Sequence, residues 1–126
     1  MVSAALIFVG SGLGGVARWT LGEWISRGST EGFPLSTLVV NFVGCVTVGF
    51  LHIALEASSM REPYRLAIFV GVLGGFTTYS AFSRETLVLF SDRHYMLAGA
   101  NVLLSNGLCL GGAWVGMRLA SRWFGA

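Results

Sequence analysis

The sequence predicts an all-α membrane protein with four membrane-spanning helices. Only 11% of its residues are charged, whereas soluble domains carry about 25%, and its mean hydropathy is +0.72. Four apolar runs each approach the roughly 20 residues that span about 30 Å of hydrocarbon. They lie approximately at 3–25, 35–57, 66–90 and 96–120. A chain of 126 residues has room for one domain, so we expect a single four-helix transmembrane domain over residues 1–126.

The first run lies near the N-terminus and could be mistaken for a secretory signal. Its first four residues include no basic residue, and Arg18 falls inside the run. Its glycines suit close packing between helices instead; they are Gly10, Gly12, Gly14 and Gly15. We therefore expect a genuine first helix, with Arg18 reaching toward the membrane interface in preference to capping a neighbouring helix.

The charges argue against a nucleic-acid partner. All eight basic residues are arginine and the net charge is +2, which is too small and too dispersed for nucleic-acid binding. The arginines divide nearly evenly between the two sides of the expected membrane, so the positive-inside bias is weak. Such a chain is able to insert in both orientations. Because four helices are few for enclosing a pathway, we also expect an oligomer.

The sequence offers no set of residues for enzyme chemistry. It contains no CxxC, no HExxH and no carboxylate cluster, and His52 and His94 are isolated from other ligands. Cys45 and Cys109 each lie inside an apolar run. Small buried thiols are a better interpretation of them than a disulfide or a metal pair. We therefore expect neither a metalloenzyme nor any other enzyme.

Two of the runs carry polar side chains on one face. In the second run, Asn41 follows Thr37 by four residues, so the two share a helix face. Asn41 either bonds a neighbouring helix or lines a pore, and the spacing favours neither alternative. In the fourth run, Asn101, Ser105 and Cys109 recur at intervals of four. Polar stripes of this kind face the interior of a helix bundle.

The third run is interrupted near its centre by Gly71, Gly74, Gly75, Thr77 and Thr78. Glycine weakens a helix by roughly 1 kcal/mol relative to alanine, and hydroxyl groups compete for the backbone hydrogen bonds. Backbone that leaves a helix at membrane depth persists only when it is buried in protein or lines a wet cavity. We therefore predict a third helix that is broken near its centre, beside a pore.

Two aromatic residues follow this interruption. Tyr79 and Phe82 are three residues apart and so share a helix face. One interpretation is a packing stripe. The other uses the partial positive charge of the ring edges, which together with hydroxyl and amide donors suits a small, strongly hydrated anion. Carbonyls at the interruption would suit a cation. No acidic residue lies centrally in any run, as a proton-coupled transporter usually requires, and Glu85 is expected to cap a helix or pair with an arginine.

Three motifs resemble the Fluc (CrcB) family of fluoride channels, and the resemblance covers essentially the whole chain. They are Gly-Gly-Val-Ala-Arg at 14–18, Leu-Val-Val-Asn-Phe-Val-Gly at 38–44, and Gly-Gly-Phe-Thr-Thr-Tyr-Ser-Ala-Phe-Ser-Arg-Glu at 74–85. The last is highly specific. The resemblance implies a fluoride-selective channel that exports cytoplasmic fluoride passively and gives fluoride resistance. It also implies an antiparallel, dual-topology homodimer in the bacterial cytoplasmic (inner) membrane.

The resemblance assigns roles to particular positions. Those that fall on the fluoride pathway are Asn41, Tyr79, Phe82, Ser80, Thr37 and Ser105. Among them are the pore asparagine, the two rings of an aromatic box, and the hydroxyls of a polar track. The main-chain carbonyls of Gly74 and Thr77 would hold a structural Na⁺ at the dimer centre.

The chain departs from the family pattern at two positions. The family usually has Phe-Ser-Thr-Phe where this chain reads Tyr79-Ser80-Ala81-Phe82. Tyr79 adds a hydroxyl group that would either donate to fluoride or narrow the path. Ala81 removes a hydroxyl group, whose role is then absent or taken over by Tyr79.

Two alternatives come from other classes of protein. A small dual-topology multidrug exporter has a similar length, but it needs an acidic residue deep in its first helix, and this chain has none before Glu23. A non-transporting membrane assembly subunit would explain the glycines and Asn41. It would not explain why polar residues of three runs converge on one interruption.

Overall fold

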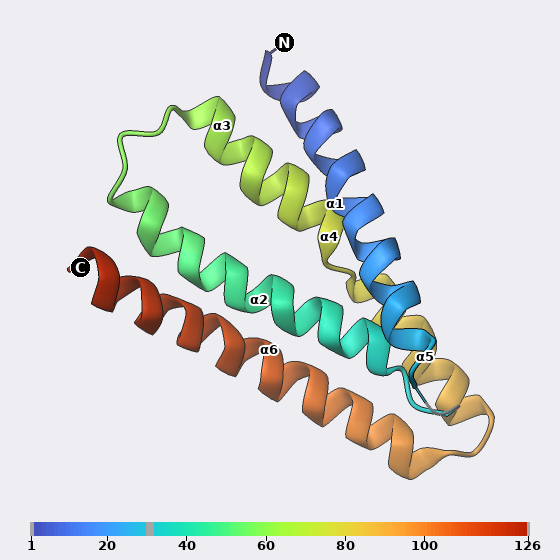
Figure 1. The fold of residues 1–126 in the computed structure, drawn as a ribbon. Helices are drawn as coiled ribbons and strands as arrows, with labels where there is room; N and C mark the ends of the chain where they lie inside the picture. The colour runs from blue at the N-terminus through green and yellow to red at the C-terminus, as the bar shows by residue number, and fades with distance from the viewer. Residues whose placement is uncertain (1, 30–31, 126) are drawn as a thin grey trace.

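The computed structural model describes residues 2–29 and 32–125. It contains four helices that are long and apolar enough to cross a membrane. They are α1 (Val2–Ser26), α2 (Leu35–Glu56), a third span over Glu62–Ser91, and α6 (Tyr95–Phe124). Successive helices run in opposite directions, so that α2 and α6 lie side by side and point the same way (Figure 1). The prediction of an all-helical, multi-pass membrane protein is confirmed.

The third and fourth helices are longer than the predicted runs. The third begins at Glu62 rather than at 66 because Pro63 occupies its first turn, where the fixed φ of proline suits a helix and its missing N–H is not needed. The fourth ends at Phe124 rather than at 120. It stops where Gly125 takes a left-handed φ of 69°. The apolar runs therefore mark the centres of these helices better than their ends.

The third span consists of several segments. After α3 (Glu62–Leu66), a π-helical stretch, η1 (Ala67–Leu73), leads into α4 (Gly74–Phe76). Thr77 (φ −81°, ψ 158°) and Thr78 (φ −150°, ψ 109°) are extended, and α5 (Tyr79–Ser91) follows them. Figure 1 shows this connection as a thin segment between α4 and α5. The extended residues interrupt the succession of main-chain helical bonds, so their polar groups need other partners.

Close backbone contacts hold the helices in two pairs. A Cβ atom on Gly49 of α2 would collide with the Ala113 carbonyl of α6, and a Cβ atom on Gly116 would collide with the Val46 carbonyl. In the other pair, α1 contacts η1 and α4, and a Cβ atom on Gly14 would collide with the Val72 carbonyl. Small residues permit this approach. The first apolar run is thus a helix packed against the third span.

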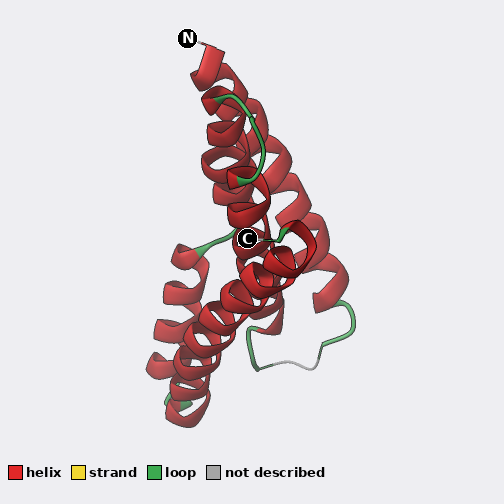
Figure 2. Cartoon of the chain, turned by 90° about the vertical axis from the view of Figure 1, so that its left-hand side faces the viewer, coloured by secondary structure: helices red, strands yellow, loops and turns green. Residues whose placement is uncertain are grey.

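Many large apolar side chains lie on the outer surface. Figure 2 shows helices joined by loops, and the described residues contain no strand. The buried apolar side chains are few, namely Leu38, Val40, Leu55, Leu73, Phe82, Leu89, Ala98 and Ala120. Many large apolar side chains point outward instead, among them Phe8, Leu103, Trp114 and Trp123. Such a surface suits hydrocarbon or a second chain rather than water.

Candidate functional site

Asn41 binds the extended residues of the third span. Its Nδ2 donates to the Thr78 carbonyl at 2.9 Å, and the Thr78 N–H donates to its Oδ1 at 2.7 Å. One amide thus satisfies both main-chain groups of a residue outside any helix. Of the two alternatives for Asn41, bonding to a neighbouring segment is observed, and the same side chain also lines a cavity described below.

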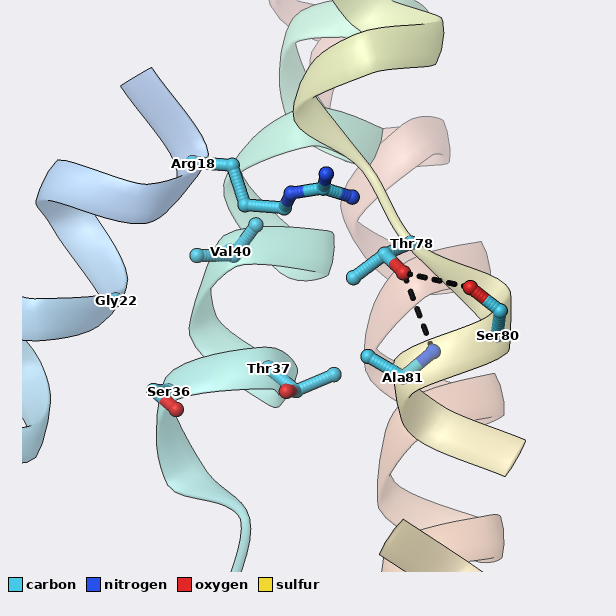
Figure 3. Close-up of a pocket in the computed structure, with 8 residues that line it drawn as sticks. All are labelled: Arg18, Gly22, Ser36, Thr37, Val40, Thr78, Ser80 and Ala81. Atoms are coloured by element: carbon cyan, nitrogen blue, oxygen red, sulfur yellow. Dashed lines mark hydrogen bonds between the residues drawn. The ribbon is translucent and has the colours of Figure 1, made fainter. Parts of the chain in front are cut away.

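The two threonines complete the helix ends on either side. Thr77 donates both its N–H and its hydroxyl group to the Leu73 carbonyl, each at 3.0 Å. Thr78 is the N-cap of α5, because its Oγ1 accepts from the Ala81 N–H at 3.2 Å. Ser80 Oγ lies 3.3 Å from the same Thr78 oxygen (Figure 3). Local hydroxyl groups therefore replace the bonds that a continuous helix would make.

One cavity, of about 260 Å³, contains four of the six predicted pathway residues. These are Asn41 on α2, Tyr79 and Phe82 on α5, and Ser105 on α6. The rings of Tyr79 and Phe82 lie 5.1 Å apart between centroids, at 48° to one another. Phe82 is 6% exposed, whereas Tyr79 is 74% exposed and projects from the bundle. We call this space the aromatic cavity.

A second cavity, of about 290 Å³, contains the other two predicted pathway residues, Thr37 and Ser80. Thr78 lines both cavities, and Ala81 and Arg18 also line the second one (Figure 3). We call it the arginine cavity, since Arg18 is the one charged residue among those that line it. The structure therefore divides the predicted pathway residues between two spaces that meet at Thr78.

Arg18 turns inward instead of reaching toward the membrane interface, so that expectation is wrong. Its Nη1 donates to the Thr77 carbonyl at 3.4 Å, across from α1 to the third span. The cause is that Thr77, after the end of α4, presents a carbonyl group outside any helix. An unpaired carbonyl of this kind attracts a cationic side chain.

The hydroxyl group of Thr37 is already bonded. Its Oγ1 donates to Glu85 Oε1 at 2.8 Å, and Glu85 Oε2 is buried without a hydrogen-bond partner among the described residues. Within the same residues, Glu85 makes no ion pair with an arginine, contrary to one of the two expectations for it. A hydroxyl group whose proton points at a carboxylate can only accept elsewhere. Thr37 therefore offers no free donor in this arrangement.

Ser105 belongs to a chain of hydrogen bonds that links α6 to α5. Ser105 Oγ donates to Asn101 Oδ1 at 3.2 Å, and Asn101 Nδ2 donates to Thr86 Oγ1 at 2.9 Å. Thr86 in turn donates to the Phe82 carbonyl at 2.8 Å. Asn101 is only 1% exposed, so the prediction that this stripe faces the bundle interior is confirmed. The sequence did not single out Thr86, because its role depends on which helix faces it.

The predicted cation ligands Gly74 and Thr77 lie at the two ends of α4. The Thr78 N–H, which would bond the Gly74 carbonyl in a continuous helix, bonds Asn41 instead. The Thr77 carbonyl faces Arg18. Within the described part of the chain, no group of three or more histidine, cysteine or acidic side chains is placed to hold a metal ion.

Comparison with known proteins gives the family. Residues 5–117 match the family described as CrcB-like protein, Camphor Resistance (CrcB). The chain belongs to this family. A relative from Coxiella burnetii (strain CbuK_Q154), named fluoride-specific ion channel FluC, is 41% identical over 123 residues, which cover 96% of this chain and 99% of the relative.

Other CrcB-like relatives carry similar names. A fluoride-specific ion channel FluC from Geobacter sulfurreducens is 39% identical, covering 97% of this chain and 99% of its own. A fluoride-specific ion channel FluC 2 from Symbiobacterium thermophilum is also 39% identical, over 93% of this chain and 96% of the relative. The similarity thus extends over almost the full length of each relative. These names describe ion channels and not enzymes.

Proposed function

We propose that this CrcB-like protein is a fluoride-selective channel. It exports cytoplasmic fluoride passively, down its electrochemical gradient, and so gives fluoride resistance. The observation that carries the proposal is the combination, in one cavity, of the Asn41 amide and the Tyr79–Phe82 ring pair, in a chain 41% identical to a fluoride-specific channel over nearly its whole length.

The chemistry of the aromatic cavity supports a small anion. The Asn41 amide has two N–H bonds, and one of them is used on Thr78. The second N–H and the positive ring edges of Phe82 and Tyr79 together offer donors without a full charge. Weak neutral donors replace the hydration shell of fluoride without binding it too strongly to leave. Chloride is larger and more weakly hydrated, so it gains less from the same closely spaced donors.

The arginine cavity would then be the wide approach to these donors. Arg18 supplies the positive charge there, and a positive charge in a low-dielectric cleft concentrates anions. Thr37 and Ser80 line this approach with hydroxyl oxygens. Fluoride would pass from the arginine cavity past Thr78 to the aromatic cavity. The third span would act as two half-helices joined by Thr77 and Thr78.

We further propose an antiparallel, dual-topology homodimer in the bacterial cytoplasmic membrane. The weak charge bias of the sequence allows both orientations, and Tyr79, beside the pathway, projects from its own chain with 74% of its surface exposed. A partner chain related by two-fold symmetry would cover this ring and the apolar surface around it.

The residues at the ends of α4 fit a structural Na⁺ at the centre of this dimer. The Gly74 carbonyl lacks its helical N–H partner, because that N–H bonds Asn41. The Thr77 carbonyl lies outside a helix and accepts one hydrogen bond from Arg18, at 3.4 Å, so the second lone pair of its oxygen is free. Two such carbonyls from each chain would supply oxygen ligands. The ion would tie the two chains together.

Fluoride efflux from liposomes tests the proposal. Purified protein is reconstituted into liposomes that are loaded with the potassium salt of fluoride or of chloride. A potassium ionophore balances the charge of the leaving anion, and the efflux of each anion is followed. We expect rapid fluoride efflux and negligible chloride efflux. An absence of fluoride efflux, or equal efflux of both anions, would overturn the proposal.

A further inference from the structure

Two free thiols, Cys45 of α2 and Cys109 of α6, both line the aromatic cavity. Both side chains are only partly buried, and they reach the same cavity from two helices that pack against each other. Tyr79 and Phe82 line the same cavity. The sequence suggested two separate small buried residues, whereas the fold brings them together in an accessible space.

The packing of α2 against α6 fixes the spacing of these thiols. Val46 directly follows Cys45, and its carbonyl abuts Gly116 of α6. Ala113 lies one turn after Cys109, and its carbonyl abuts Gly49 of α2. In both contacts the carbonyl of one helix touches a glycine Cα of the other, with no side chain between them. The two helices are therefore tightly packed near Cys45 and Cys109. The two helices therefore hold both thiols in the wall of one cavity.

We propose that Cys45 and Cys109 form a binding site for a soft metal ion that accepts two ligands, such as Hg²⁺. Thiolates select soft metals. The described residues place no third histidine, cysteine or acidic side chain to complete a larger set, so a four-ligand zinc site is not formed. On binding, two S–H bonds break and two S–Hg bonds form, and the two protons leave to solvent. No oxidation state changes.

A metal ion bound here obstructs the aromatic cavity. The cavity has a volume of about 260 Å³ and is shared by Asn41, Phe82 and the two thiols. An ion bridging the sulfur atoms takes up part of this space and pulls both thiols into a fixed position. The obstruction of fluoride rests on the proposed channel function, whereas the binding of the metal does not.

Metal binding is tested on the detergent-solubilised full chain by native mass spectrometry with mercuric chloride. We expect the protein to hold one Hg²⁺ per chain with the loss of two protons. 2-Mercaptoethanol should remove the metal from Cys45→Ser and from Cys109→Ser at about tenfold lower concentration than from the wild-type protein. In the wild type, the second thiolate competes with the added thiol at a high effective concentration. Two Hg²⁺ ions per chain, or equal ease of removal in all three proteins, would overturn the site.

Obstruction is tested by fluoride efflux, with each protein compared with its own metal-free efflux. One equivalent of Hg²⁺ should remove most of the efflux through the wild-type protein, and dithiothreitol should restore it. The double variant Cys45→Ala/Cys109→Ala should be insensitive. Retained metal with unchanged efflux would overturn the obstruction. If the metal-free wild-type protein passes no fluoride, the channel proposal fails, while the mass measurement still decides the metal site.

Discussion

The side chain of Asn41 makes two opposed hydrogen bonds with the main chain of Thr78, one donated at 2.9 Å and one accepted at 2.7 Å. This pair of bonds replaces the helical bonds that an extended residue is unable to make. It joins α2 to the third span at the point where the aromatic and arginine cavities meet. Asn41 therefore shapes the proposed pathway and also lines it.

Replacement of Asn41 by alanine should destabilise the protein and abolish fluoride efflux. Both main-chain groups of Thr78 would lose their partner, at a cost of about 1–3 kcal/mol for each unpaired buried group. Thermal unfolding in detergent and liposome efflux measure the two effects. Asn106→Ala is the matched control, because Asn106 lines the same cavity but bonds only the Val102 carbonyl of its own helix. Equal behaviour of the two variants would contradict this role of Asn41.

Replacement of Phe82 by isoleucine should abolish efflux and leave the protein folded. Isoleucine keeps most of the apolar bulk but has no ring edge, and a swap of this kind in a core usually costs less than about 1.5 kcal/mol. Phe90→Ile, on the exposed face of the same helix, should conduct normally. Undiminished efflux through Phe82→Ile would mean that the ring pair serves packing alone.

Replacement of Tyr79 by phenylalanine should change efflux by less than about twofold. Tyr79 lines the aromatic cavity, whereas Ala81, where the family usually has threonine, lines the arginine cavity. Because they face different spaces, the hydroxyl group of Tyr79 is not positioned to replace the missing one. Ala81→Thr should therefore alter efflux by a similar factor in the wild type and in Tyr79→Phe, because the two side chains line different cavities. A strong dependence of one change on the other would refute this independence.

Replacement of Gly49 by alanine should destabilise the protein. The added Cβ atom would meet the Ala113 carbonyl of α6, and relief would require the two helices to separate, which typically costs about 1–3 kcal/mol or more for overpacking. Gly111→Ala is the control, because a Cβ atom there meets nothing within 4 Å. It should leave stability unchanged or raise it by up to about 1 kcal/mol, as alanine favours a helix. Size-exclusion profiles and melting temperatures in detergent distinguish the two variants.

The sequence by itself determined the class of the fold and the approximate places of the four spans, and it predicted a weak point in the third. These properties are local: they depend on the length of apolar runs and on the conformational preferences of glycine and threonine. The extended residues Thr77 and Thr78 fall inside the predicted interruption. The ring pair of Tyr79 and Phe82 was likewise predictable, because spacing along one helix sets which side chains meet.

Only the tertiary structure decided which polar groups are paired and which space each one faces. Thr37 and Ser105 were both predicted to line the pathway, yet Thr37 bonds Glu85 and lines the arginine cavity, whereas Ser105 bonds Asn101 and lines the aromatic cavity. Arg18 turned inward because a carbonyl of another span became available to it. Cys45 and Cys109 line one cavity because glycines let α2 and α6 approach. Hydrogen bonds and thiol contacts act over a few ångströms between helices, and no spacing within one helix encodes such distances.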